Sequence, residues 1–184
     1  PYACCGSNHT TIDALKSIIA ENGLTSQEIK KIDIKTTTVT YMHVGWPYKA
    51  ESVTSAQMNL YYCAAVCVLD GDVFTDQFQM KRIKSEDIMN LIKKIKISSS
   101  PELDKLGHEK RHSVVVQILT EDERTFGKRV DYAKGHPNNP LDYNDLLNKY
   151  RKLAGAVWAK DRVSRTADQI FELEKLNDVN EINL

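Results

Sequence analysis

The sequence lacks any long hydrophobic run and any excess of charge of one sign. Its 184 residues include 25 basic and 25 acidic side chains, and the mean hydropathy is -0.44. A membrane-spanning helix needs about 20 consecutive apolar residues, so a transmembrane segment is excluded, and no secretory signal is recognisable. Nucleic acids and anionic membranes select a concentrated basic face. The balanced charge and the pI near 7.3 therefore argue against both as partners.

Cysteine is scarce and unevenly spaced. Cys4 and Cys5 are adjacent, and Cys63 and Cys67 are one helical turn apart. This is not the spaced framework of a small disulfide-rich scaffold, and it predicts a reducing, cytoplasmic location. A zinc site would need two vicinal ligands and a pair on a buried helix, which structural zinc sites rarely use. Buried thiols that pack as small hydrophobes are the favoured interpretation, and we expect neither a metal nor another cofactor.

Several catalytic motifs are also missing. The sequence has no G-x-S-x-G elbow, P-loop, G-x-G-x-x-G turn or H-E-x-x-H pair, which removes the common phosphate, dinucleotide, hydrolase and zinc-protease signatures. The remaining candidates for chemistry are single acid and base residues.

Hydrophobic periodicity and capping residues predict alternating helices and strands. The expected helices cover residues 8 to 22, 54 to 70 and 85 to 95, with two more that begin at Asp142 and Ser164. The expected strands are one that ends near Tyr41 and a hairpin over residues 112 to 132, while residues 42 to 52 and 97 to 111 are expected to be loops. No composition shift divides the chain, so residues 1 to 184 are predicted to form one α+β domain. Its sheet should be small, antiparallel or mixed, with helices packed on one face.

Two residues are candidates for acid-base chemistry. His9 is expected in the first turn of the helix over residues 8 to 22, where the helix dipole disfavours a second positive charge. A neutral imidazole can accept or donate a proton, and the N-H groups of that turn could hold a substrate carboxylate. The alternative is that His9 only caps and packs. Tyr62, on a helix that is apolar all round, is by default a core tyrosine unless its hydroxyl points into a wet cavity.

The other titratable loop residues have no partner fixed by local spacing. His43, His112 and His136 are interpreted as structural. Lys134 could meet an anion, but a solvated lysine is the stronger expectation.

Three ordered blocks carry a resemblance to a known family. The blocks are PYACCGSNHTTIDALKSIIAENGL, TSAQMNLYYCAAVCVLDGDVF and GHPNNPLDYNDLLNKYRKLA. Together they resemble the C-terminal half of the MmgE/PrpD family, which includes 2-methylcitrate dehydratase, cis-aconitate decarboxylase and iminodisuccinate epimerase. The chain begins at Pro1, without methionine, and is expected to be a piece of a longer protein.

The resemblance implies a two-domain enzyme in which this chain is the C-terminal α+β lid, and an N-terminal helical domain, absent here, supplies the rest of the active site. In such enzymes the lid lends a histidine and a tyrosine to the cleft, and these match His9 and Tyr62. The implied chemistry is cofactor-independent proton transfer α to a carboxylate, as in a lyase or isomerase of a small di- or tricarboxylate, with 2-methylcitrate dehydration in propionate catabolism as the type reaction. A homodimer is also implied.

The chain departs from the family pattern at two places. Gly6 stands where many members have arginine, and Tyr61 stands where many have proline. These departures keep a second hypothesis open, in which the domain is a non-catalytic binding or assembly module and His9 and Tyr62 serve packing.

Overall fold

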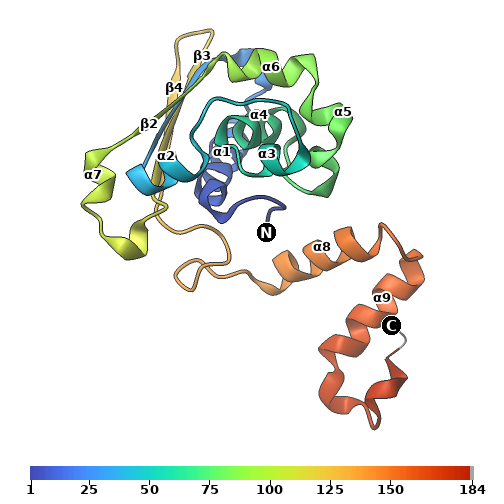
Figure 1. The fold of residues 1–184 in the computed structure, drawn as a ribbon. Helices are drawn as coiled ribbons and strands as arrows, with labels where there is room; N and C mark the ends of the chain where they lie inside the picture. The colour runs from blue at the N-terminus through green and yellow to red at the C-terminus, as the bar shows by residue number, and fades with distance from the viewer. Residues whose placement is uncertain (183–184) are drawn as a thin grey trace. The chain divides into compact units, whose positions relative to one another are not determined.

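The computed structural model describes residues 1 to 182 and divides into two compact units. Residues Tyr2 to Asn139 form the larger unit, and the residues from Pro140 onward, with Pro1, form the smaller one (Figure 1). Each unit is described by itself. In the part of the chain that the structure describes, no helix combines the length and the apolarity needed to cross a membrane.

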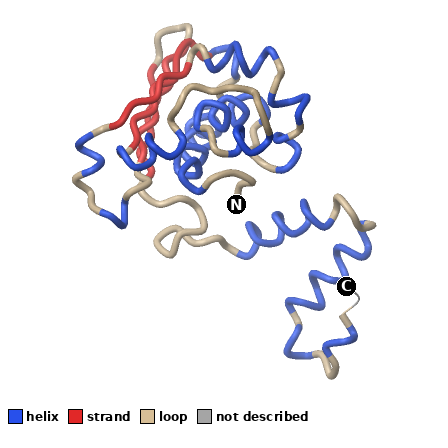
Figure 2. The backbone as a smooth tube through the Cα atoms, in the orientation of Figure 1, coloured by secondary structure: helices blue, strands red, loops and turns tan. Residues whose placement is uncertain are grey.

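The larger unit is built on a four-stranded mixed sheet with the strand order β2-β1-β3-β4. β1 (Ile29–Thr36) pairs in parallel with β2 (Ile95–Ser99) and antiparallel with β3 (Val114–Thr120), which forms a hairpin with β4 (Thr125–Val130). The predicted hairpin is thereby confirmed. The strands lie together in Figure 2, with the helices gathered beside them.

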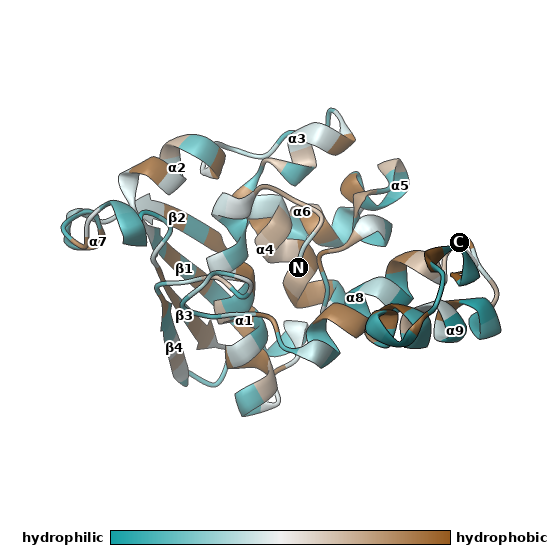
Figure 3. Ribbon diagram, turned by 90° about the horizontal axis from the view of Figure 1, so that it is seen from below, coloured by the Kyte–Doolittle hydropathy of each residue, from teal (hydrophilic) through white to brown (hydrophobic). Residues whose placement is uncertain are grey.

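Helices cover one face of the sheet, as predicted. Along β1, Ile32, Ile34 and Thr36 are buried while Lys31 and Lys35 are exposed, which is the alternation of a sheet with one covered face. α1 (His9–Asn22) packs on β3, β4 and α4, and α4 (Leu60–Asp70) lies at the centre of the core (Figure 3). The fold is therefore α+β.

The other helices of this unit are short. They are α2 (Thr38–Val44), α3 (Val53–Gln57), α5 (Met80–Ile83), α6 (Glu86–Ile92) and α7 (Pro101–Asp104), with 3-10 turns at Gly6–Asn8, Ser26–Glu28, Thr75–Phe78 and His108–Lys110. A capping box joins Thr25 and Glu28 at the 3-10 turn that precedes β1.

The predicted extension of the first strand to Tyr41 is wrong. β1 ends at Thr36, and Thr37 caps α2 by accepting a hydrogen bond from the Thr40 backbone N-H. Thr36, Thr38 and Thr40 alternate with the period of a strand. A threonine with an extended backbone is also a good N-cap, and Thr37 has that conformation. The capping preference determines the local structure here, and it places α2 beside the end of the sheet.

The single helix expected over residues 54 to 70 is divided in two. α3 ends at Gln57, and Asn59 starts α4 by accepting the Tyr62 N-H at 3.1 Å on its side-chain oxygen. The residues that form the α3 capping box are Ser52 and Ser55. Residues 53 to 70 contain no glycine or proline, the residues that most often indicate a break between two helices.

The largest error concerns residues 95 to 111. Ile95 was assigned to a helix and residues 97 to 111 to a loop, whereas Ile95 and Ile97 lie in β2 opposite Ile32 and Ile34 of β1. A five-residue strand bordered by lysines has too few apolar residues for a clear period, and its parallel partner is far away in sequence. The error matters because the segment after β2 carries one wall of the cavity described below.

The smaller unit consists of α8 (Tyr143–Ala154), α9 (Lys160–Phe171) and 3-10 turns at Leu173–Lys175 and Val179–Glu181. Asp142 caps α8 as predicted, since its carboxylate accepts the Asp145 N-H at 2.8 Å. The last helix begins at Lys160, four residues before the predicted start at Ser164.

Candidate functional site

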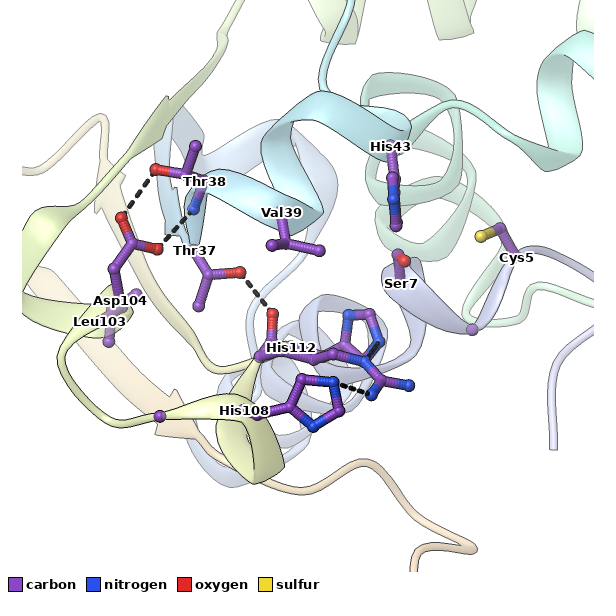
Figure 4. A pocket seen from close by; sticks show the side chains of 13 residues that line it. Cys5, Ser7, Thr37, Thr38, Val39, His43, Leu103, Asp104, His108 and His112 are labelled. Atoms are coloured by element: carbon purple, nitrogen blue, oxygen red, sulfur yellow. Dashed lines mark hydrogen bonds between the residues drawn. The ribbon is translucent and has the colours of Figure 1, made fainter.

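A cavity of about 780 Å³ lies in the larger unit at the end of the sheet where β1 passes into α2 (Figure 4). Three segments line it: the residues before α1, the first turns of α2, and the connection from α7 to β3. The lining residues are Cys5, Gly6, Ser7, Thr37, Thr38, Val39, His43, Leu103, Asp104, Gly107, His108, Arg111 and His112. Pockets for small molecules commonly enclose about 300 to 1,000 Å³, so the cavity is large enough for a metabolite.

Hydrogen bonds join the second and third segments. The Asp104 carboxylate accepts the Thr38 N-H and the Thr38 hydroxyl, both at 2.7 Å. These bonds favour the charged carboxylate and hold the pKa of Asp104 below its usual value. The Thr37 hydroxyl donates to the Arg111 carbonyl, as does the Thr40 hydroxyl at 3.2 Å. Side-chain bonds to fixed backbone groups thus hold the cavity wall in place.

Arg111 lies between two histidines of the wall. Its Nη1 donates to Nε2 of His108 at 3.0 Å, and its Nε donates to Nε2 of His112 at 3.2 Å. Because a guanidinium can only donate, both Nε2 atoms act as acceptors in this arrangement. The cavity therefore has one permanent positive charge on an exposed side chain, held by two imidazoles.

His112 has a defined tautomer. With Nε2 accepting from Arg111, its Nδ1 carries the proton and donates to the Thr40 hydroxyl at 3.0 Å. Partial burial lowers the pKa of His112, and the nearby positive charge of Arg111 lowers it further. The neutral imidazole is therefore favoured near neutral pH.

His9 is the first residue of α1, as predicted, but its ring is not among the groups that line the cavity. Its Nε2 lies 3.2 Å from the Cys4 carbonyl oxygen, and its ring packs edge-on against Tyr2 at a centroid distance of 5.2 Å. Its neighbour Ser7 does line the cavity. His9 thus follows directly after the segment that lines one side of the cavity, without lining the cavity itself.

Asn8 stands at the N-cap position of α1, but its side chain makes no capping hydrogen bond. The side chain is fully buried and donates from Nδ2 to the Gln57 carbonyl at 3.1 Å and to Cys63 Sγ at 3.3 Å. Its Oδ1 atom is buried without a hydrogen-bond partner.

Tyr62 is a core residue in this structure. It is fully buried on α4, and its hydroxyl donates to the Gln77 carbonyl. The ring packs against Tyr48 and Phe78 at centroid distances of 5.2 and 5.6 Å. Burial raises the pKa of the phenol above its usual value. Tyr62 does not line the cavity, and the structure does not bring it and His9 to a common open site.

Most of the residues that line the cavity are not candidates on sequence grounds. The interpretation of His43 and His112 as structural residues, and of residues 97 to 111 as a loop, gives no indication that His43, His108, Arg111 and His112 share a cavity. The dense run HEKRH at residues 108 to 112 is the signal that could have indicated them. Within residues 1 to 182, no three His, Cys, Asp or Glu side chains are grouped as ligands of a metal ion.

Comparison with known proteins places the chain in a family. The model of the MmgE/PrpD C-terminal domain matches residues 2 to 173. The cis-aconitate decarboxylase-like protein oryM of Aspergillus oryzae is 30% identical over 98% of the chain, and a cis-aconitate decarboxylase of Aspergillus terreus is 26% identical over 97%. A cis-aconitate decarboxylase of Mus musculus is 27% identical over 83% of the chain.

The chain spans 38% of the length of each of the two Aspergillus proteins and 30% of the mouse protein. The family match covers all of the larger unit and most of the smaller one. The chain therefore belongs to the MmgE/PrpD family, of which it is a C-terminal domain.

Proposed function

We propose that this chain is the C-terminal domain of a lyase or isomerase that acts on a small di- or tricarboxylate by proton transfer α to a carboxylate, without a cofactor. The observation that carries the proposal is the position of Arg111 in a cavity of metabolite size. A guanidinium presents paired N-H donors that match the two oxygens of a carboxylate. Two of the Arg111 donors are used by His108 and His112, which leaves the others for a ligand.

The surroundings of Arg111 support carboxylate binding. The one acidic side chain among the lining residues, Asp104, is held by Thr38, away from Arg111. Ser7 and His43 lie across the cavity from Asp104 (Figure 4). Together with the backbone of Gly6, which also lines the cavity, they offer further polar contacts. Arg111 lines the same cavity as Gly6, so it could supply the positive charge that many family members carry at the Gly6 position.

We propose His9 as the residue that moves the proton. His9 follows Gly6 and Ser7, which line the cavity, and its Nε2 would first have to leave the Cys4 carbonyl to act there. Tyr62 is proposed as a second catalytic group, a donor to a developing oxyanion or leaving group. Its hydroxyl would first have to leave the Gln77 carbonyl.

The relatives favour decarboxylation over dehydration, since those compared are named cis-aconitate decarboxylases or cis-aconitate decarboxylase-like. In a decarboxylation, one carboxylate leaves as carbon dioxide and its bonding electron pair stays on carbon. A general acid then protonates that carbon. The carboxylates that stay on the substrate need fixed positive charges beside them. Arg111 is one such charge, and a preceding helical domain would supply the others. A homodimer in a cytoplasmic location is part of the same proposal.

The test is turnover by the full-length protein on cis-aconitate, citrate and 2-methylcitrate, with release of carbon dioxide or water as the readout. The variants are His9→Ala, Tyr62→Phe and Arg111→Gln, and Tyr48→Phe is the control because its hydroxyl also donates to a buried carbonyl, that of Ile83. We expect His9→Ala and Tyr62→Phe to lower kcat and Arg111→Gln to raise KM. Variants with wild-type kinetics would remove the assigned roles.

The second candidate function is a non-catalytic binding module. The observation that favours it is the full burial of Tyr62, whose hydroxyl already has a backbone partner. Carboxylate binding to the cavity without turnover on any of the three acids would support this module and contradict the enzyme.

A further inference from the structure

A second, smaller cavity of about 450 Å³ adjoins the one described above. His108, Arg111 and His112 line both cavities. The other polar residues that line the second cavity are Glu109, His136 and Asn138, and the larger unit contains them all. Because the two cavities share the wall that carries Arg111, its guanidinium can contact a ligand in either of them.

The other wall of the second cavity is a turn that its own backbone closes. The Gly135 N-H donates to the Asn139 carbonyl at 2.7 Å, and the Asn139 N-H donates to the His136 carbonyl at 2.8 Å. The Lys134 N-H donates to the Asp13 carboxylate of α1 at 2.7 Å. The turn that carries His136 is therefore fixed both internally and to a helix of the core.

Asp131 connects the two walls. It comes shortly before the turn in the sequence, and its carboxylate accepts the Ser113 hydroxyl and the Lys110 ammonium, both at 3.0 Å. Lys110 and Ser113 flank the segment that carries Arg111. Arg111 is the one arginine or lysine among the residues that line the second cavity, so it supplies the positive charge there as well.

His136 offers a donor of defined position. Its Nδ1 accepts the Asn138 N-H at 3.1 Å. A backbone N-H can only donate, so Nδ1 carries no hydrogen and the ring hydrogen is on Nε2. The ring also stacks on Tyr132 at a centroid distance of 4.6 Å, which limits its rotation. Nε2 is therefore a donor whose orientation is set before a ligand binds.

We propose that the second cavity is a subsite for a second carboxylate of the substrate, bound by Arg111 and by the Nε2 N-H of His136. The proposal rests on the proposed function, in which Arg111 binds a first carboxylate in the larger cavity. The bonds to His112 and His108 use the N-H of Nε and one N-H of Nη1, so the guanidinium keeps one N-H on Nη1 and both on Nη2. These remaining donors can contact one carboxylate in each cavity. A substrate that fills both cavities needs at least two carboxylates, and this requirement sets the chemical class that the site selects.

Glu109 opposes the binding of an anion in the second cavity. Its side chain is exposed and lines the cavity, so its carboxylate repels a bound carboxylate. Glu109→Gln removes this charge and should tighten the binding of a polycarboxylate about twofold, the size expected for one exposed charge. Loss of a purely structural contact would not produce such a gain.

The test measures the binding of tricarballylate to the full-length protein by calorimetry. This tricarboxylate has no hydroxyl group to lose as water and no double bond to accept the electrons of a decarboxylation, so it binds without turnover. We expect a single molecule per chain. His136→Ala should weaken binding about tenfold through the loss of a hydrogen bond to a charged group, and His136→Gln, which keeps an N-H donor, should recover most of the affinity. Tyr132→Phe is the matched control, because it keeps the ring that stacks on His136 and lines neither cavity.

The outcomes separate the subsite from the proposed function. Weaker binding in both His136→Ala and Arg111→Gln, with an unchanged midpoint of urea denaturation, supports the subsite. Weaker binding in Arg111→Gln alone overturns the subsite and leaves the proposed function in place. Unchanged binding in both variants contradicts the subsite and the carboxylate role of Arg111 together.

Two further results would overturn the subsite. Binding of two molecules per chain, of which His136→Ala abolishes one, would make the second cavity a site for a separate carboxylate. If His136→Ala does not fold, Glu109→Gln decides the question, and an affinity equal to that of the wild type would contradict the subsite.

Discussion

The Arg111 guanidinium donates from Nε to Nε2 of His112 at 3.2 Å. The same group donates from Nη1 to Nε2 of His108 at 3.0 Å, so the planar guanidinium is held at two points by neighbours from its own segment. An arginine held in this way loses less side-chain entropy when it binds a carboxylate than a freely rotating one would.

Arg111→Gln is expected to weaken substrate binding by removing the fixed charge of the cavity. A hydrogen bond to a charged group contributes about 1.5 to 3 kcal/mol, and partial exposure of Arg111 places the effect at the lower end, so KM should rise about tenfold. Steady-state kinetics on the full-length protein measure this change. Arg124→Gln is the control, because Arg124 pairs with Asp122 in the turn of the hairpin and does not line the cavity. Equal KM values for Arg111→Gln and wild type would contradict the assignment.

His112 should make the free energy of unfolding depend on pH. Its pKa is lower in the folded chain than its unfolded value of about 6.5, so the unfolded chain binds more protons below that pH. The stabilisation from the neutral imidazole is therefore fully present above pH ~6.5 and is lost as the pH falls through the folded pKa. Chemical denaturation of wild type and His112→Gln from pH 5 to 8 should show a shallower slope for the variant. Parallel curves would show that the His112 pKa does not shift on folding.

Tyr62→Phe is expected to lower the free energy of unfolding by about 1 to 3 kcal/mol, because the Gln77 carbonyl loses its buried donor. Tyr48→Phe should cost a similar amount, since its hydroxyl donates to the Ile83 carbonyl at 2.7 Å. Each variant removes one buried hydrogen bond, but only Tyr62 is proposed to take part in catalysis. If Tyr62→Phe lowers kcat and Tyr48→Phe does not, Tyr62 acts on the substrate. If kcat is unchanged in both, Tyr62 is only a core residue.

Local signals in the sequence were sufficient for much of the fold. The helix over α1, the helix cap at Asp142 and the hairpin of β3 and β4 all appear in the structure. Each depends on residues within one or two turns of each other, which is the range over which propensity and capping act.

Residues that depend on long-range contacts were not predictable in this way. β2 is a strand because Ile95 and Ile97 pair with β1 some 63 positions away. The cavity wall around Arg111 is held by Thr37 and Thr40 of α2, again far away in sequence. Neither the strand pairing nor these hydrogen bonds produce a hydrophobic period or a motif spacing in the local sequence. His9 and Tyr62 came from the family resemblance, and their roles stay predictions.

Asn8 offers a test of how the segment before α1 is held. Asn8→Ala removes the donor to the Gln57 carbonyl and to Cys63 Sγ, and it also removes the unpaired Oδ1. The first loss costs about 1 to 3 kcal/mol, and the second recovers part of that cost, so we expect a net loss of about 1 to 2 kcal/mol. Asn8→Asp should be more damaging, because it leaves a fully buried carboxylate, without the donors of the amide, beside the Gln57 carbonyl and the Cys63 sulfur. Thermal and urea denaturation of the two variants check this order. Equal stability of Asn8→Asp and Asn8→Ala would show that the side chain at position 8 is not buried in the folded chain.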